Sequence, residues 1–135
     1  MGGKFVMAGE TRAEVLDWGT LRWLSNPPST NARALTVLDV TFGPGKGHAF
    51  HKHPDQEEVI YVVAGRVEQW VDRDKRVLGP GDSVFLPAGM VHASFNVGDT
   101  DVHIVAILGP CVGESGYEVV EVAGEAPWNG LRQQG

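Results

Sequence analysis

Residues 45–65, GKGHAFHKHPDQEEVIYVVAG, decide how the whole chain is interpreted. Within them, His51 and His53 are two residues apart, a spacing that separates side chains on a helix but places them on one face of a β-strand. Two imidazoles on one face, with Glu58 close behind, are how a strand presents nitrogen and oxygen ligands to a metal ion. Taken alone, the histidine pair equally fits an exposed, histidine-rich loop.

A second stretch, residues 81–96, reads GDSVFLPAGMVHASFN and supplies a further histidine, His92. Its glycine turns allow the chain to reverse, so we expect His92 to return opposite the first stretch. Glu58 has the strand parity of the apolar residue Ile60, whereas Glu57 has the opposite parity and is expected to face solvent. The predicted metal ligands are therefore His51, His53, Glu58 and His92.

The rest of the chain reads as many short strands separated by turn residues. No stretch has a helical period of any length, and the double proline at 27–28 is expected to break any helix or central strand. Regularly spaced short strands predict an all-β sandwich or barrel. The expected strands are 20–24, 35–42, 59–63, 66–71, 76–78, 84–86, 91–97 and 102–108, with 117–122 as a possible last strand and 125–135 as irregular covering polypeptide.

Composition restricts the partners and the compartment. With 135 residues and a net charge of −6, the chain suits one domain and is a poor match for nucleic acid or an anionic membrane surface. No apolar run approaches the roughly 18 residues of a membrane span, and no signal-peptide core follows the first residues. The single cysteine, Cys111, excludes an intrachain disulfide framework and is expected to be a buried or incidental thiol. We therefore expect a cytoplasmic protein.

Together, the two stretches resemble the paired motifs of the cupin superfamily, and they match them at every defining position from Gly45 to Asn96. The resemblance implies a double-stranded β-helix, which is a small jelly-roll barrel, with a metal inside its mouth. We expect one cupin domain over 1–135, with a barrel core at about 35–108 and flanking segments at 1–34 and 109–135. The predicted ligands suit a divalent ion of Fe, Mn, Ni, Co, Cu or Zn, and affinity alone does not choose among these metals.

The resemblance also implies self-association. The two flanking segments hold three of the four tryptophans, and apolar surface of this kind usually finds a partner, so a homodimer is expected.

The resemblance does not imply one reaction, because a fold does not settle function. Our leading hypothesis is a metal-dependent enzyme, dioxygenase-like or isomerase/lyase-like, that acts on a small organic substrate inside the barrel. The alternative is a non-catalytic barrel that binds or senses a small ligand, and a third possibility keeps the metal as a structural staple. No acid or base beyond Glu58 stands out. His48 is expected to be an exposed loop residue, and His103 a core residue or a neighbour of the metal ligands.

Overall fold

The computed structural model describes residues 2–132, and most of its regular structure is β-strand. The strands of this part of the chain are β1 (Arg12–Val15), β2 (Thr20–Ser25), β3 (Thr36–Phe42), β4 (Gly47–Lys52), β5 (Glu57–Ala64), β6 (Val67–Val71), β7 (Asp74–Leu78), β8 (Ser83–Leu86), β9 (His92–Asn96), β10 (Val102–Gly109) and β11 (Val120–Glu121). The helical elements are the single turn α1 (Pro27–Thr30) and the 3₁₀ turns η1 (Ala8–Glu10) and η2 (Trp128–Gly130). Met1 and 133–135, the outermost residues of the predicted flanking segments, lie outside the described residues.

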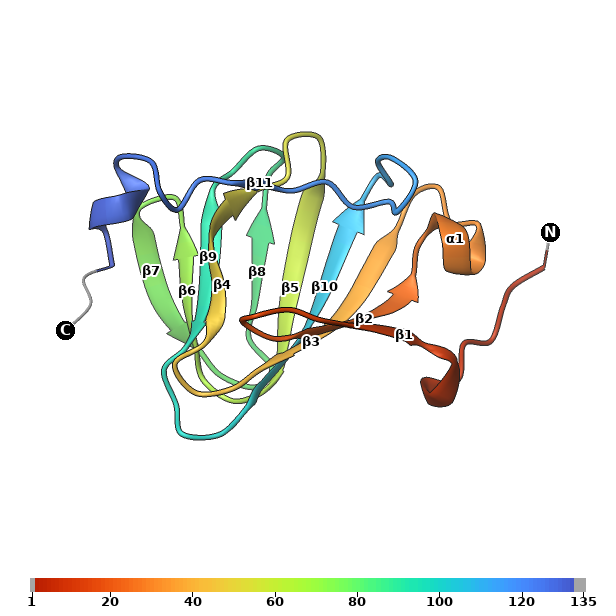
Figure 1. Cartoon of the computed structure of the whole chain (residues 1–135), viewed down its shortest axis with the longest axis horizontal. Coiled ribbons are helices and arrows are strands. Elements are labelled where there is room, and N and C mark those ends of the chain that lie inside the picture. The colour runs from red at the N-terminus through yellow and green to blue at the C-terminus, as the bar shows by residue number, and fades with distance from the viewer. Residues whose placement is uncertain (1, 133–135) are drawn as a thin grey trace.

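The strands form two antiparallel sheets that face each other (Figure 1). One sheet has the order β1-β2-β3-β10-β5-β8, and the other has the order β11-β4-β9-β6-β7. Consecutive strands often belong to opposite sheets, as β4 and β5 do, so the chain winds back and forth between the layers. This arrangement is the predicted double-stranded β-helix, and the all-β prediction is confirmed.

The core lies between the two sheets, and the period-two pattern of the sequence explains it. Along β3, every second side chain is buried, which is how a strand with one face on a core is patterned. β10 lies between β3 and β5 and alternates in the same way. The inward side chains of these three strands form one apolar cluster, made chiefly of Leu38, Val40, Phe42, Ile60, Val62, Val102, Ile104, Ala106 and Leu108.

Each of the eight expected strands is present with ends shifted by a few residues, but three local expectations are wrong. β1 was not expected, and the possible strand at 117–122 is reduced to β11. Pro27 and Pro28 do not break a helix but begin α1, because the first turn of a helix does not use the N–H that proline lacks. Asn26 caps this turn by accepting a hydrogen bond from the N–H of Ser29 at 3.3 Å.

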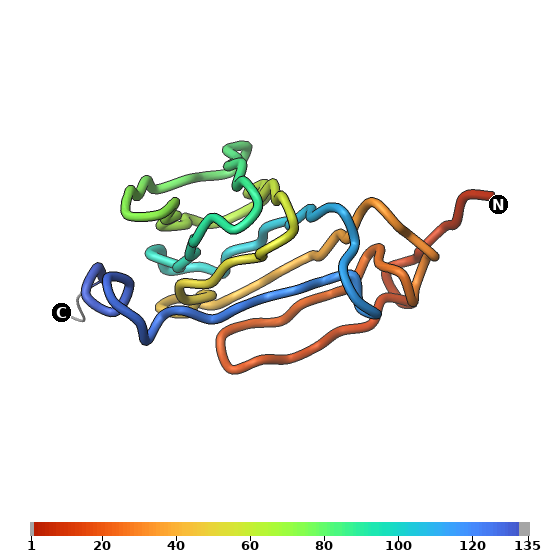
Figure 2. The backbone as a smooth tube through the Cα atoms, turned by 90° about the horizontal axis from the view of Figure 1, so that it is seen from above, coloured from red at the N-terminus to blue at the C-terminus, as the bar shows by residue number. Residues whose placement is uncertain are grey.

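Two outer segments complete the molecule beside the barrel. The β1–β2 hairpin and the chain from 109 to 122 cross the same side of the barrel and lie next to each other in the view of Figure 2. Beyond β11, the last described residues pack Trp128 and Leu131 against the outer face of the second sheet, around Phe50 and Trp70. Among residues 2–132, we find no helix that is long and apolar enough to span a membrane.

Candidate metal centre

The structure brings the four predicted ligands to one place inside the barrel. His51 lies on β4, His53 just beyond the end of that strand, Glu58 near the start of β5 and His92 at the start of β9. His51 and His92 are direct partners in the register of β4 and β9, so the second stretch does return opposite the first. All four side chains are buried. Glu57 faces solvent, as its parity predicts.

The polar atoms of these side chains converge closely. Glu58 Oε1 lies 3.2 Å from Nε2 of His53 and 2.9 Å from Nε2 of His92. Each of His51, His53 and His92 has a ring nitrogen within 4.8 Å of one on the other two. Three nitrogens and a carboxylate oxygen in so small a volume form a donor set that suits a divalent transition metal.

Backbone carbonyls hold all three imidazole rings by the same atom. Nδ1 of His51 lies 2.7 Å from the carbonyl of Ala49, and Nδ1 of His92 lies 2.9 Å from that of Met90. Nδ1 of His53 lies 2.6 Å from the carbonyl of Glu118. Because a carbonyl only accepts, each Nδ1 carries the hydrogen, and the lone pair of the neutral ring is on Nε2. This is how histidines that bind a metal through Nε2 are oriented.

The centre has unsatisfied polar atoms at its middle. Glu58 Oε1 and His92 Nε2 are fully buried and make no well-aligned hydrogen bond to any described residue, although they lie 2.9 Å apart. An oxygen lone pair and a nitrogen lone pair at this distance repel each other unless a proton or a cation lies between them. The residues therefore fit a bound cation, and the remaining charge with a divalent ion and one carboxylate would be +1.

The close contacts at the centre also shift the pKa values of its side chains. Burial alone would raise the pKa of Glu58, but the adjacent Nε2 atoms of His53 and His92 outweigh it and lower the pKa to about 2. Burial would lower the pKa of His53, but contact with Glu58 raises it above its ordinary value. For His51, burial and then the nearby His48 lower the pKa well below its ordinary value. The contact between Glu58 and His53 thus favours the charged form of both groups in the absence of a metal.

His48 is not the exposed loop residue that the sequence predicted. In a regular strand, residues three apart face opposite sides. A register shift between His48 and His51 reverses this and brings both rings to one side of β4. Their rings stack with centroids 3.4 Å apart, and the ring of Trp18 stacks on the other face of His48 at 4.7 Å. Nε2 of His48 also lies 2.9 Å from a carboxylate oxygen of Glu121 on β11.

His103 and Cys111 lie away from this centre. His103 is on the outer face of its sheet, where Nε2 lies 2.8 Å from Asp39 Oδ1, so the expectation of a core histidine or a neighbour of the ligands is wrong. Cys111 is a half-buried free thiol whose sulfur lies 3.4 Å from the hydroxyl of Thr36. That Cys111 is a buried or incidental thiol stays a prediction.

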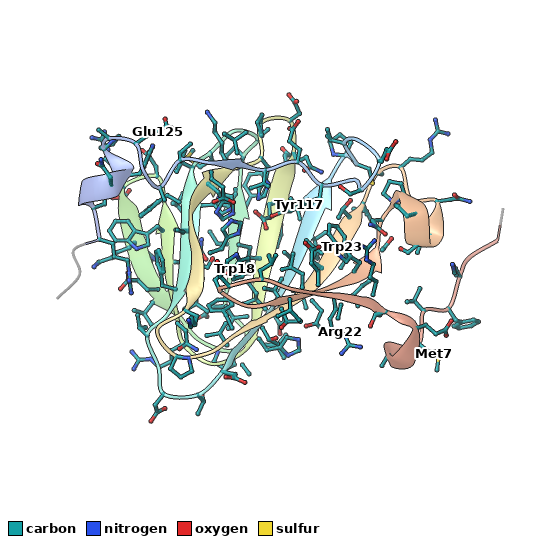
Figure 3. All side chains as sticks on the ribbon, viewed as in Figure 1. Met7, Trp18, Arg22, Trp23, Tyr117 and Glu125 are labelled. Carbon is teal, nitrogen blue, oxygen red and sulfur yellow. The ribbon has the colours of Figure 1, made fainter. Side chains whose placement is uncertain are left out.

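Tyr117, which the sequence did not single out, lies between the centre and the surface. Its ring centroid is 5.1 Å from that of His53 and 5.8 Å from that of Trp23. Burial, together with the carboxylates of Glu58 and Glu121, raises the pKa of this phenol, which keeps it protonated. Figure 3 shows Tyr117 and Trp23 in the space between the β1–β2 hairpin and the chain above it. No local pattern at 117 could have predicted this contact.

Gln56 is a second residue that sequence reasoning missed. It is 1% exposed, and its amide nitrogen donates to the carbonyls of Pro110 at 2.7 Å and Gly116 at 2.9 Å. Its amide oxygen accepts a hydrogen bond from the N–H of Glu118 at 3.0 Å. Gln56 therefore fastens the chain after β10 to the loop between β4 and β5, which places the Glu118 carbonyl against His53.

Comparison with known proteins agrees with this architecture. A family model described as a cupin domain matches residues 38–108. Polyketide synthase CurC from Streptomyces cyaneus is 34% identical over 92 residues, which cover 68% of this chain and 60% of that protein. Oxalate oxidase GF-3.8 from Triticum aestivum is 28% identical over 117 residues, which cover 78% of this chain and 50% of that protein.

Solved structures extend the likeness to the fold. Oxalate decarboxylase from Bacillus subtilis, solved in a study of its Mn(II) centres, superposes with a TM-score of 0.71 at 22% identity. The match covers 84% of this chain and 30% of that chain. In sequence, the chain spans between 37% and 67% of the length of the first curated relatives it matches.

Proposed function

Because this chain belongs to the cupin domain family, we propose that it is a metal-dependent enzyme that acts on a small organic substrate in its barrel. The single observation that carries the proposal is the convergence of Glu58 Oε1 and three histidine rings, with buried atoms left unpaired at its middle. Support also comes from relatives whose names describe oxalate oxidation and Mn(II) centres.

In this proposal, His51, His53, Glu58 and His92 hold the metal. The ion would supply Lewis-acid or redox chemistry to a substrate oxygen, and Mn or Fe suits this donor set. The protein's own part is to hold the three Nε2 lone pairs in place through the Nδ1 hydrogen bonds of the same rings and to bury the carboxylate of Glu58. Tyr117, protonated and close to His53, is positioned to donate a hydrogen bond to a bound oxygen.

The metal test uses protein that has never met a metal-affinity resin. We expect about one transition-metal ion per chain by plasma mass spectrometry, and about a hundredfold weaker binding in Glu58→Gln, because the only anionic ligand is lost. Glu57→Gln is the matched control, since it changes the neighbouring carboxylate on the outer face of the same strand. Equal loss in both variants, or full metal content in Glu58→Gln, would contradict the proposed ligand set.

A second measurement separates an enzyme from a structural staple. Azide or nitric oxide added to the Mn- or Fe-loaded protein should change its electron paramagnetic resonance spectrum, because an open centre accepts an outside ligand. A spectrum that neither molecule changes would support a closed structural site. If the spectrum responds but oxygen-electrode and mass-spectrometric screens show no turnover, the chain is a ligand-binding barrel.

We propose in addition that two copies associate through the outer face of the β5–β8 edge. Tyr61, Val63 and Phe85 are exposed there and belong to the same face of paired strands. Exposed apolar side chains gathered in this way mark interaction surfaces. Light scattering should show a dimer that Phe85→Glu converts to a monomer, whereas Val77→Glu, which changes an exposed valine on the other sheet, leaves it intact. A monomeric parent protein would end this idea.

A further inference from the structure

Two connected cavities lead from the surface to the candidate metal centre. The outer cavity, of about 340 Å³, lies between the β1–β2 hairpin and residues 115–121. The inner cavity, of about 30 Å³, is lined by His51 and Glu58 of the centre and continues among the core side chains. Trp18, His48 and Tyr117 line both cavities, so they mark the passage between them.

The walls of the outer cavity are mainly aromatic and aliphatic. Trp18, Trp23 and Tyr117 contribute rings, and Leu16, Leu21 and Val119 contribute aliphatic side chains. Figure 3 shows the three rings gathered in the space above the hairpin. Its volume is at the low end of the roughly 300–1,000 Å³ typical of small-molecule sites, which are lined in this way. Such walls favour flat, apolar ligands, because aromatic rings gain from packing on one another.

The charged groups around the passage have one sign. Glu14 and Glu121 line the outer cavity and Glu58 lines the inner one, whereas none of the lysines and arginines of residues 2–132 lines either cavity. Arg22, on β2 beside Trp23, points to the other side of the hairpin, where its guanidinium donates to Thr11 Oγ1 and to the carbonyl of Ala8 (Figure 3). An anionic ligand would therefore meet Glu14 and Glu121 and no cationic side chain in the outer cavity, and in the metal-free protein it would also meet Glu58.

The inner cavity limits which group can approach the centre. Its volume, about 30 Å³, is much smaller than the 340 Å³ of the outer cavity. The rings of an aromatic ligand therefore stay in the outer cavity, and only a small polar group, such as a hydroxyl or enol oxygen, extends toward the centre. The hydroxyl of Tyr117, which has no hydrogen-bond partner among the described residues, lies on this route and can bind such an oxygen.

We propose, building on the proposed metal-dependent function, that the substrate is an uncharged, flat aromatic molecule that carries a hydroxyl or enol oxygen. Its ring lies in the outer cavity against Trp18, Trp23 and Tyr117, and its oxygen reaches through the passage toward Glu58. Small dicarboxylates such as oxalate, the substrate that the names of several relatives give, are disfavoured by the carboxylates and the aromatic walls of the outer cavity.

The test compares 2-naphthol with 2-naphthoate, which has the same rings but a carboxylate in place of the hydroxyl, and with oxalate. Isothermal titration calorimetry is run on the protein as purified and again after its metal has been removed by a chelator. We expect 2-naphthol to bind the metal-free form at least about tenfold more tightly than 2-naphthoate, with no saturable oxalate binding to that form. Tighter binding of 2-naphthoate or oxalate than of 2-naphthol to the metal-free form overturns the proposal.

Single substitutions test where 2-naphthol binds. One of them is expected to strengthen the binding of 2-naphthoate, a result that a misfolded variant could not give. Trp18→Ala should weaken 2-naphthol binding about tenfold, whereas Val77→Ala, which trims an exposed side chain outside both cavities, should leave it unchanged. Val119→Arg places a cation at the rim and should tighten 2-naphthoate binding by about fivefold. Val120→Arg, one residue away and outside the cavity lining, is its control and should not.

These outcomes keep the two proposals apart. A protein that binds 2-naphthol with this selectivity but contains no metal upholds the cavity assignment and contradicts the metal-dependent function. A protein that binds the metal through the four ligands but shows no 2-naphthol binding overturns the substrate class alone.

Discussion

Nδ1 of His53 donates a hydrogen bond to the backbone carbonyl of Glu118, 65 residues further along the chain, at 2.6 Å. A ligand that the sequence places in the first motif is therefore oriented by a backbone group from outside both motifs. Gln56 holds that group in place through three hydrogen bonds to the chain between Pro110 and Glu118.

Replacing Gln56 by Leu should therefore weaken metal binding about 10- to 100-fold, the usual effect of losing a group that orients a ligand. It also removes the partner of the Pro110 carbonyl and of the Glu118 N–H, while the Gly116 carbonyl keeps its bond from the Thr36 hydroxyl at 2.6 Å, so the free energy of unfolding should fall by about 1 kcal/mol or more. Metal titration and urea unfolding measure the two effects. Glu118→Ala retains the carbonyl and removes only the side-chain bond to the N–H of Asp55, so its effect on metal affinity should be much smaller. Equal effects would contradict this role of Gln56.

The metal-free protein should lose stability in acid through Glu58. Its pKa is about 2 in the folded chain against an ordinary 4.5, so its contribution is complete above pH 4.5 and disappears as the pH falls toward 2. A depression of this size corresponds to about 3 kcal/mol of unfolding free energy. Urea unfolding at pH 5 and pH 3 should show most of this loss, about 2 kcal/mol, in the parent and in Glu57→Gln. Glu58→Gln should not show it, and a loss of the same size in that variant would assign the acid sensitivity to other groups.

Removing His48 should raise the pKa of His51 in the metal-free protein. Burial and the neighbouring His48 are the two largest causes that depress it, and His48→Ala relieves both. Nuclear magnetic resonance titration of the His51 ring measures the change directly. His103→Ala is the control, because His103 lies on the outer face of the other sheet and should leave His51 unaffected. A His51 pKa that does not move would mean that the stacked ring has no electrostatic effect.

Gly65, which ends β5, should not tolerate a side chain. Its φ of +91° favours glycine, and an added Cβ would lie 2.7 Å from the carbonyl oxygen of Asp101 and 2.8 Å from Cα of Val102. Gly65→Ala should therefore lower the unfolding free energy by about 2 kcal/mol or more. Gly124→Ala meets nothing within 4 Å and should cost little. Thermal unfolding of the two variants makes the comparison, and similar melting temperatures would contradict the expected strain.

The sequence was informative where structure follows from neighbouring residues. The period-two patterns of 35–42 and 59–63 predicted strands with one buried face, and the motif spacing predicted the barrel and the gathering of His51, His53, Glu58 and His92. That these four hold a metal is still a prediction. The contacts of His53 with Glu118 and Tyr117, and those of Gln56 with the chain from Pro110 to Glu118, could not be anticipated, because they join segments more than 50 residues apart without a local pattern.

His48 shows a different limit. Strand parity alone placed it away from His51, and only the register shift between them reverses that result. Such an irregularity depends on how β4 pairs with β9, so it belongs to the tertiary structure and not to the residues of β4 alone.

The bond between His53 and Glu118 also determines when the centre can exist during biosynthesis. All four proposed ligands have been synthesised once His92 is added, but the group that orients one of them follows 26 residues later. A nascent chain that ends between His92 and Glu118 contains all four proposed ligands but lacks the carbonyl that orients His53. Contacts of such high sequence separation also form late in folding. Full affinity for a metal thus arises only after Glu118 has been added, which limits the capture of unsuitable ions by shorter nascent chains.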